Sequence, residues 1–152
     1  MPKFAADRML ARIARWLRML GADVIFDGSI DGATMLKRAR VEGRIVLTRD
    51  KRLKTATDVY FLDSNLFREQ LRAILARYPF DIHRENLSRC SGCNTQLIAV
   101  DREVVRTRVP PFVYASNEKF YECPSCAHLY WNGTHPGRIM LEIERLLQTP
   151  HA

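Results

Sequence analysis

The sequence has 152 residues, enough for one α/β domain with a small appendage and too few for two full-sized domains. Hydrophobic residues make up 47% of it, yet no segment approaches the roughly 20 uninterrupted apolar residues that a membrane-spanning helix needs. With 24 basic and 17 acidic residues, the formal net charge is +7. The composition therefore excludes a membrane-spanning protein, and the charge favours polyanionic partners over neutral metabolites.

The N-terminal segment, Met1 to Asp7, lacks the apolar core of a secretory signal peptide. We therefore expect a cytoplasmic protein, in which cysteine thiols stay reduced and disulfides are not formed.

Short β-rich segments alternate with helical segments from Lys3 to Phe80. The expected strands cover 3–6, 23–27, 44–50 and 58–62, and the expected helices cover 8–20, 33–42 and 66–78. Gly21 and Gly43 are expected to end the first two helices, and Asp31 or Ser29 to cap the second. Alternation of this kind predicts right-handed crossovers and a mainly parallel sheet with helices on both faces.

Acidic residues follow the expected strands. Asp7, Asp50 and Asp63 each come shortly after a strand, and Asp27 and Asp31 flank the loop between the second strand and the second helix. The carboxyl ends of parallel strands share one edge, where active sites gather, so these carboxylates are expected to converge. Converging carboxylates repel one another unless a cation neutralises them, and all-oxygen ligands suit Mg²⁺ or Mn²⁺. The alternative for each aspartate alone is a turn or N-cap role.

A group of arginines directly follows Asp7. At 3.6 residues per turn, Arg8, Arg12 and Arg15 fall on one helical face with Arg18 at its edge, and no acidic residue interleaves with them. This face is either a solvated charge stripe or a surface that holds phosphates.

Four cysteines form two CxxC pairs, Cys90 with Cys93 and Cys123 with Cys126, and the spacer 94–122 separates the pairs. In a cytosolic chain this pattern predicts a tetrahedral, structural zinc site. The segments 97–100, 104–105 and 120–121 between the pairs are β-rich, as in a zinc ribbon. A redox role would require a CxxC at the start of a helix just after a strand, and neither pair has that setting.

Aromatic residues follow the second pair. Tyr130 and Trp131 either stack on unpaired nucleic-acid bases or pack the ribbon against its neighbour. His128 and His135 are candidate ligands or proton carriers, although four cysteines already satisfy a zinc ion. A last amphipathic helix over 138–147 is expected to dock on the core.

Several segments in a fixed order carry a resemblance to one family. They are FAADRML at 4–10, RWLRMLG at 15–21, LTRD at 47–50, the two CxxC pairs, and YWNGTH at 130–135. The chain resembles the Mut-seven C-terminal RNase domain family, whose fold is a PIN-like nuclease domain fused to a zinc ribbon. The resemblance implies an α/β, three-layer PIN-like domain at 1–84, a Cys₄ zinc ribbon at 85–136 and a docking C-terminal helix at 137–152.

The same resemblance implies metal-dependent cleavage of single-stranded RNA. Asp7, Asp31 and Asp50 would hold one or two Mg²⁺ or Mn²⁺ ions, Thr48 would orient that site by hydrogen bonding, and Asp63 is the candidate fourth acid. The expected RNA contacts are Arg8, Arg12, Arg15, Arg49 and Trp131, and RNA-processing proteins are possible partners. The alternatives are a non-catalytic RNA-binding or adaptor protein with a degenerate acidic site, and a redox or zinc-sensing protein that uses the cysteines.

Overall fold

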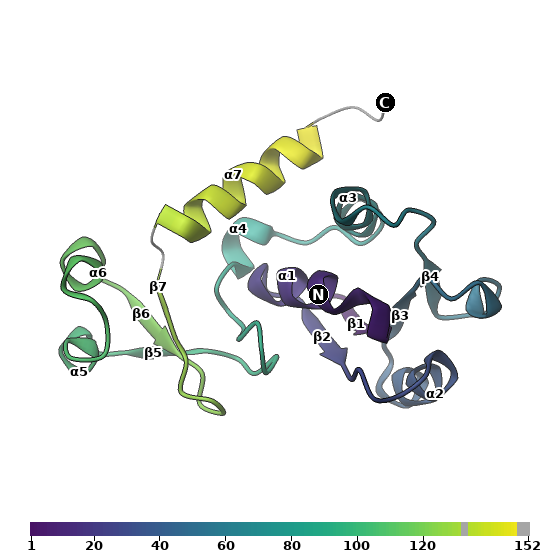
Figure 1. Ribbon diagram of the computed structural model, residues 1–152, viewed down its shortest axis with the longest axis horizontal. Coiled ribbons are helices and arrows are strands. Elements are labelled where there is room, and N and C mark those ends of the chain that lie inside the picture. Colours follow the sequence, from purple (N-terminus) through teal and green to yellow (C-terminus); the bar gives the residue numbers. More distant parts are fainter. Residues whose placement is uncertain (132–133, 149–152) are drawn as a thin grey trace. The chain divides into compact units, whose positions relative to one another are not determined.

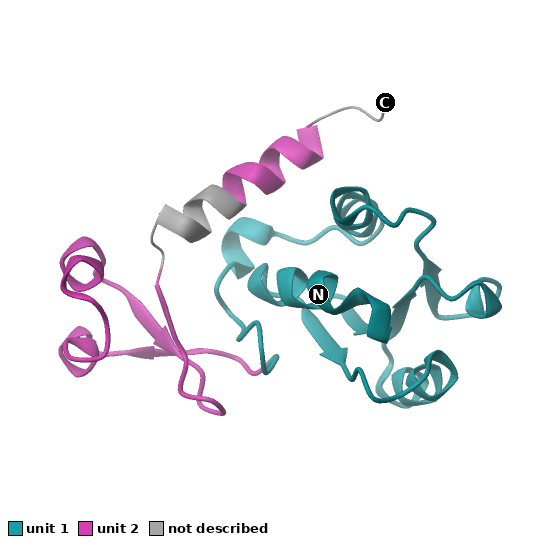
Figure 2. Cartoon of the chain, in the orientation of Figure 1, with its two compact units in different colours: residues 1–94 teal, residues 95–152 magenta. Residues whose placement is uncertain are grey.

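The computed structural model describes residues 1–131 and 134–148, and of residues 134–139 the backbone only. The chain divides into two compact units, residues 1–94 and residues 95–152 (Figure 2). The domain boundaries at 84/85 and 136/137 stay predictions.

A four-stranded sheet forms the centre of the first unit (Figure 1). Its strands are β1 (Lys3–Ala6), β2 (Asp23–Phe26), β3 (Ile45–Thr48) and β4 (Val59–Phe61), in the order β2-β1-β3-β4. Every neighbouring pair is parallel, with Ala6 opposite Phe26 on β2 and Leu47 on β3. The carboxyl ends of β1 and β3 therefore lie side by side in the middle of the sheet.

Helices cover both faces of this sheet, with α1 and α3 on one face and α2 on the other (Figure 1). The helical segments of this unit are η1 (Arg8–Leu10), α1 (Ala11–Met19), α2 (Gly32–Glu42), η2 (Lys51–Leu53), α3 (Phe67–Arg77) and α4 (Ile82–Glu85), where η marks a 3₁₀ turn. The predicted mixed α/β fold with a parallel sheet is confirmed.

Apolar residues at helical spacing produce these layers. On α1 the buried apolar residues are Ile13, Ala14 and Leu17. On α2 they include Met35, Leu36 and Ala39, which pack against Ala5 and Val46 of the sheet. Strands buried on both faces need continuous apolar runs, which is what β1 and β3 provide.

Glycines end the first two long helices as predicted. Gly43 adopts a left-handed conformation with φ of 67° after α2, and Gly21 has φ of 102° after α1. At Gly21 a Cβ would overlap the Glu85 carbonyl oxygen, so only glycine fits there. The single helix expected over 8–20 is instead a 3₁₀ turn followed by α1, and the Met9 side chain in that turn is 63% exposed.

The second unit has a three-stranded antiparallel sheet, β5-β6-β7. Its elements are β5 (Ile98–Val100), α5 (Arg102–Val105), α6 (Pro111–Ser116), β6 (Phe120–Glu122), β7 (Leu129–Trp131) and α7 (Thr134–Gln148). A small core of Val105, Val109, Val113 and Phe120 joins the two short helices to the sheet. The strand expected at 104–105 was wrong, because Asp101 accepts a hydrogen bond from the Glu103 backbone N–H and begins a helix there.

Over residues 1–131 and 134–148, no helix combines the length and the apolar character that crossing a membrane would require.

Candidate active site

Two acidic residues meet at the carboxyl edge of the central strands. Asp7 directly follows β1, and its backbone N–H donates to the Leu47 carbonyl of β3 at 3.0 Å. Asp50 lies two residues beyond the end of β3. Pairing of β1 with β3 is what brings these two positions together, since β2 and α2 come between them in the chain.

Thr48, the last residue of β3, connects the two acids. Its hydroxyl donates to Asp7 Oδ2 at 2.7 Å and accepts a hydrogen bond from the Asp50 backbone N–H at 2.9 Å. The Thr48 side chain is fully buried and Asp7 is 5% exposed, so solvent cannot replace these contacts. The Asp7 Oδ1 atom accepts from the Met9 backbone N–H at 3.3 Å, which holds the rest of the carboxylate.

Asp31 and Asp50 both cap helical segments. Asp31 accepts from the Thr34 backbone N–H at 2.8 Å at the start of α2, and contacts with the Thr34 side chain and N–H hold the pKa of Asp31 below its ordinary value. Asp50 caps η2, and hydrogen bonds from the Arg52 side chain and backbone N–H likewise lower its pKa. Both carboxylates are therefore ionised at neutral pH. The capping role predicted as the alternative is confirmed for Asp31, and it leaves carboxylate oxygens for a metal ion.

A test of the fit to a metal ion is the space at Gly32, the first residue of α2. A Cβ added there would lie 2.9 Å from Leu53 Cδ1, 3.4 Å from Asp50 Oδ2 and 3.7 Å from Asp7 Oδ2. The two carboxylate oxygens therefore lie near one point, with the Leu53 side chain against it. Oxygen donors around such a space match the ligands that Mg²⁺ and Mn²⁺ prefer. Among the described residues, only the four cysteines form a group of three or more side chains close enough to hold a metal ion, so the aspartates would have to draw closer together to bind one.

Two basic residues accompany the acids. Arg52 forms a forked ion pair with Asp50, with Nη2 at 2.9 Å from Oδ2 and Nε at 3.1 Å from Oδ1. The charges of Arg8 and Arg52 both act on Asp31 and Asp50. Arg52 and Gly32 were not predicted as site residues. The sequence offered one indication of both residues, since each lies within two positions of a predicted acid.

Asp63 lies at the same edge, two residues after β4. Its backbone carbonyl accepts a hydrogen bond from Arg49 Nη2 at 3.2 Å, and its side chain is exposed. A catalytic role for Asp63 stays a prediction.

Part of the arginine face predicted on the first helix is found in the structure. Arg8, Arg12 and Arg15 are exposed, as a phosphate-binding surface requires, and the Arg12 guanidinium lies 4.0 Å from the centre of the Phe67 ring. Arg18, expected at the edge of this face, is instead 7% exposed. It points into the first unit because its charged group has acceptors there.

Arg18 connects β2 to the loop between Cys90 and Cys93. Its Nε donates to the Val24 carbonyl at 2.8 Å, and its Nη1 donates to the carbonyls of Ser91 and Gly92 at 3.1 Å each. Burial lowers the pKa of Arg18, while the negative charges of Cys90 and Cys93 favour its charged form. This guanidinium therefore both holds the loop and offsets negative charge beside it.

Asn94 forms a second connection between β2 and this loop. The Val24 N–H donates to Asn94 Oδ1 at 3.0 Å, and Asn94 Nδ2 donates to Asp23 Oδ1 at 2.8 Å. The backbone groups on the open side of an edge strand are thereby satisfied. The loop that carries the first cysteine pair is thus fixed to the sheet.

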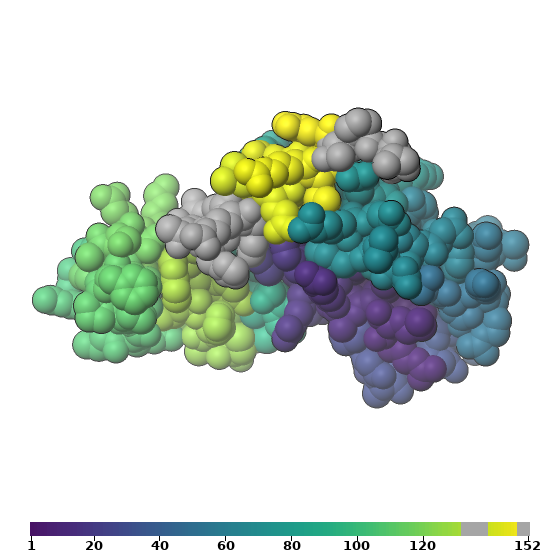
Figure 3. Space-filling model, turned by 45° about the horizontal axis from the view of Figure 1, so that its top comes forward, coloured from purple at the N-terminus to yellow at the C-terminus, as the bar shows by residue number. Residues whose placement is uncertain are grey.

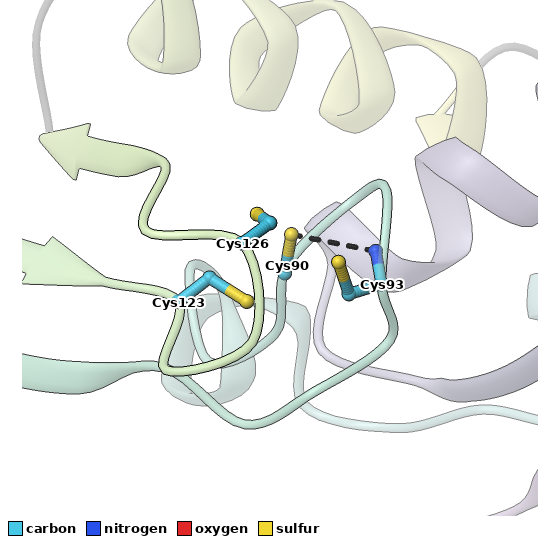
Figure 4. Close-up of side chains that lie close together, drawn as sticks. All are labelled: Cys90, Cys93, Cys123 and Cys126. Atoms are coloured by element: carbon cyan, nitrogen blue, oxygen red, sulfur yellow. Dashed lines mark hydrogen bonds between the residues drawn. The ribbon is translucent and has the colours of Figure 1, made fainter.

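The four cysteine sulfurs lie within 4.8 Å of one another, and Figure 4 shows the side chains turned toward a common point. The two CxxC turns are built alike. The residue after each pair, Asn94 or Ala127, has a positive φ of 66° or 63°, and its N–H bonds the carbonyl of the first cysteine. In the first turn the Cys93 N–H donates to Cys90 Sγ at 3.4 Å. This group could bind a metal ion such as zinc, which agrees with the predicted zinc ribbon.

The aromatic residues after the second pair have packing contacts. Trp131 packs against the core of the second unit, with its ring centre 6.4 Å from that of Phe120. The ring centres of His128 and Tyr130 are 4.8 Å apart. These contacts lie within the second unit, so both packing of the ribbon against its neighbour and an RNA contact by Trp131 stay predictions. The side chain of His135 lies outside the described residues.

Comparison with known proteins agrees with this geometry. The family model of the Mut7-C RNAse domain matches residues 2–143. No curated protein and no solved structure matches the chain. The chain belongs to the Mut7-C RNAse domain family.

Proposed function

We propose that the protein is a ribonuclease that cleaves single-stranded RNA with the help of Mg²⁺ or Mn²⁺ held by Asp7, Asp31 and Asp50. The observation that carries this proposal is that Asp7 Oδ2 and Asp50 Oδ2, from neighbouring strand ends, both lie within 4 Å of the point where a Cβ of Gly32 would stand. Membership in an RNase-domain family supports the choice of reaction.

A divalent ion bound there would lower the pKa of water and neutralise charge on the scissile phosphate. In the hydrolysis, the oxygen of water bonds to phosphorus, the P–O3′ bond breaks, and O3′ takes up a proton, which leaves a 5′-phosphate and a 3′-hydroxyl. Thr48 keeps Asp7 in place for this chemistry. Asp63, at the same edge, is the proposed fourth acid.

Arginines near the acids supply the contacts to the RNA backbone. Arg8, Arg12 and Arg15 are exposed and Arg49 is half-buried. All four follow or flank the acids, so they can neutralise phosphates on either side of the cleaved bond. A zinc ion on the four cysteines has a structural role, because such a closed site leaves no position for substrate.

The test is cleavage of end-labelled single-stranded RNA by the full chain with Mn²⁺, with Mg²⁺ and with no added metal. Omitting the metal is better than adding a strong chelator, which would also compete for an ion on the cysteines. The variant is Asp50→Asn. The matched control is Asp58→Asn, an exposed aspartate with φ of 62°, a conformation that asparagine tolerates.

We expect metal-dependent cleavage that Asp50→Asn abolishes and Asp58→Asn retains. RNA binding without cleavage under every metal condition would instead favour the adaptor alternative.

A further inference from the structure

A pocket of about 460 Å³ lies in the first unit between the start of α1 and the start of α3. Its apolar lining includes Met9, Leu66 and Phe67, and its polar lining includes Arg12, Arg49 and Gln70. Figure 3 shows the purple N-terminal segment and the teal segment that contains α3 next to each other at the surface. The volume falls within the range of small-molecule sites.

The pocket is lined by positively charged side chains and by an aromatic ring. Two arginines line it, and none of the described residues that line it is acidic. The Arg12 guanidinium lies 4.0 Å from the centre of the Phe67 ring, which in turn lies 5.1 Å from the Trp16 ring. Single-stranded RNA is typically bound by stacking its bases on aromatic rings and guanidinium planes beside cationic groups that hold phosphates.

Short connections join this pocket to the acidic edge. Met9 lines the pocket, and its backbone N–H donates to Asp7 Oδ1 at 3.3 Å. Arg49 lines it too, and stands in the chain between Thr48 and Asp50. A nucleotide in this pocket would therefore be a neighbour of the nucleotide whose phosphate is cleaved.

Polar groups in the lining are held in place. Arg49 donates from Nε to the Leu62 carbonyl at 3.4 Å and from Nη2 to the Asp63 carbonyl at 3.2 Å. Gln70 is buried and donates from Nε2 to the Ser64 carbonyl at 2.9 Å. Fixed polar groups at the edge of an apolar pocket are suited to the hydrogen-bonding edge of a base.

We propose that this pocket binds one nucleobase of the RNA strand, stacked on the platform of Arg12 and Phe67, with its phosphate beside Arg12 and Arg49. The proposal rests on the proposed function, since it gives the nuclease a base-binding position next to the acids.

The experiment measures binding by fluorescence anisotropy with no Mg²⁺ or Mn²⁺ added, so its result does not depend on catalysis. The probes are a labelled oligouridylate and an oligomer of the same length and charge in which every nucleotide is abasic. The ratio of the two Kd values isolates the contribution of the bases, because both probes share the phosphate contacts. We expect oligouridylate to bind about tenfold more tightly to the wild-type chain.

Two variants test whether the bases bind in this pocket. Phe67→Leu removes the ring and keeps an apolar side chain, and Arg12→Met removes the exposed guanidinium. Both should bring the ratio close to one, whereas the matched controls Phe112→Leu and Arg38→Met should keep it near ten. If Phe67→Leu does not fold, Arg12→Met alone decides.

Equal binding of the two probes by the wild-type chain would overturn the proposal. So would a tenfold ratio that survives in Arg12→Met and in folded Phe67→Leu, since the bases would then bind elsewhere. Failure of the nuclease proposal is a different result, namely no RNA cleavage with either metal.

Discussion

Replacing Thr48 by valine tests the hydrogen bonds that join the two acids. Valine has nearly the same shape and lacks the hydroxyl that donates to Asp7 Oδ2 and accepts from the Asp50 N–H. Because Thr48 is fully buried, no water can take its place.

The magnitude follows from the two contacts. A hydrogen bond to an ionised carboxylate contributes about 1.5 to 3 kcal/mol, and an N–H left without an acceptor costs about 1 to 3 kcal/mol. The two effects overlap, so we expect Thr48→Val to lower the free energy of unfolding by about 2 to 4 kcal/mol. Thr48→Ser keeps both hydrogen bonds and loses one buried methyl group, so it should cost about 1 kcal/mol.

The assay is urea unfolding followed by tryptophan fluorescence. The chain has two tryptophans, so a Trp131→Phe background leaves Trp16 of α1 to report on the first unit. An unchanged m-value would show that the change lies in stability and not in the compactness of either state. Thr55→Val, at an exposed position, is the matched control and should change nothing measurable.

A loss of under about 0.5 kcal/mol in Thr48→Val would refute this account, as it equals the change expected of an ordinary surface substitution. Equal losses of unfolding free energy in Thr48→Val and Thr48→Ser would also refute it, because the hydroxyl would then contribute nothing to stability.

Three further changes concern metal binding. Gly32→Ala places a Cβ 2.9 Å from Leu53 Cδ1, which must shift, and beside Asp7 and Asp50, so Mn²⁺ binding measured by calorimetry should weaken about tenfold, as when ligands are displaced. Arg52→Ala removes a cation that competes with the metal ion for Asp50, so Mn²⁺ should bind more tightly. The pKa of Asp50 measured by NMR should also rise, because the contacts that favour its charged form are lost. During a titration toward acid, this carboxyl should therefore take up its proton at a higher pH than in the wild-type chain. Arg18→Met frees the first cysteine loop from β2, so zinc should pass to a chelating dye about tenfold faster.

Each of these changes has a matched control in the chain. Gly28→Ala adds a Cβ in ordinary contact with Phe26 only, Arg38→Ala removes an exposed arginine of α2, and Arg15→Met removes an exposed arginine of α1. Unchanged Mn²⁺ affinity in Gly32→Ala would mean that the ion does not occupy that space. Weaker Mn²⁺ binding in Arg52→Ala would mean that this arginine supports the site and does not compete with the metal ion. If Arg18→Met released zinc no faster than Arg15→Met, Arg18 would not be needed to hold the first cysteine loop.

Local features of the sequence were sufficient for most of the first unit. Apolar strands alternating with amphipathic helices predicted the parallel sheet, and glycines with positive φ ended helices where expected. The CxxC spacing predicted each cysteine turn, because such turns are formed by residues close in the chain, and two such pairs together predicted the group of four. The segment 104–105 was assigned wrongly from its β-branched residues, since the cap at Asp101 outweighed their propensity.

Sequence by itself therefore determined most elements of the first unit, the family and the candidate acids of this protein. Only the tertiary structure decided which acids face a common space, because that depends on β1 pairing with β3 across the intervening β2 and α2. It also decided that Arg18 turns inward while Arg12 lies on Phe67, although both belong to one helix. Helical periodicity assigns a residue to a face, whereas the partner of a long charged side chain is set by the acceptors and rings that distant segments bring to it.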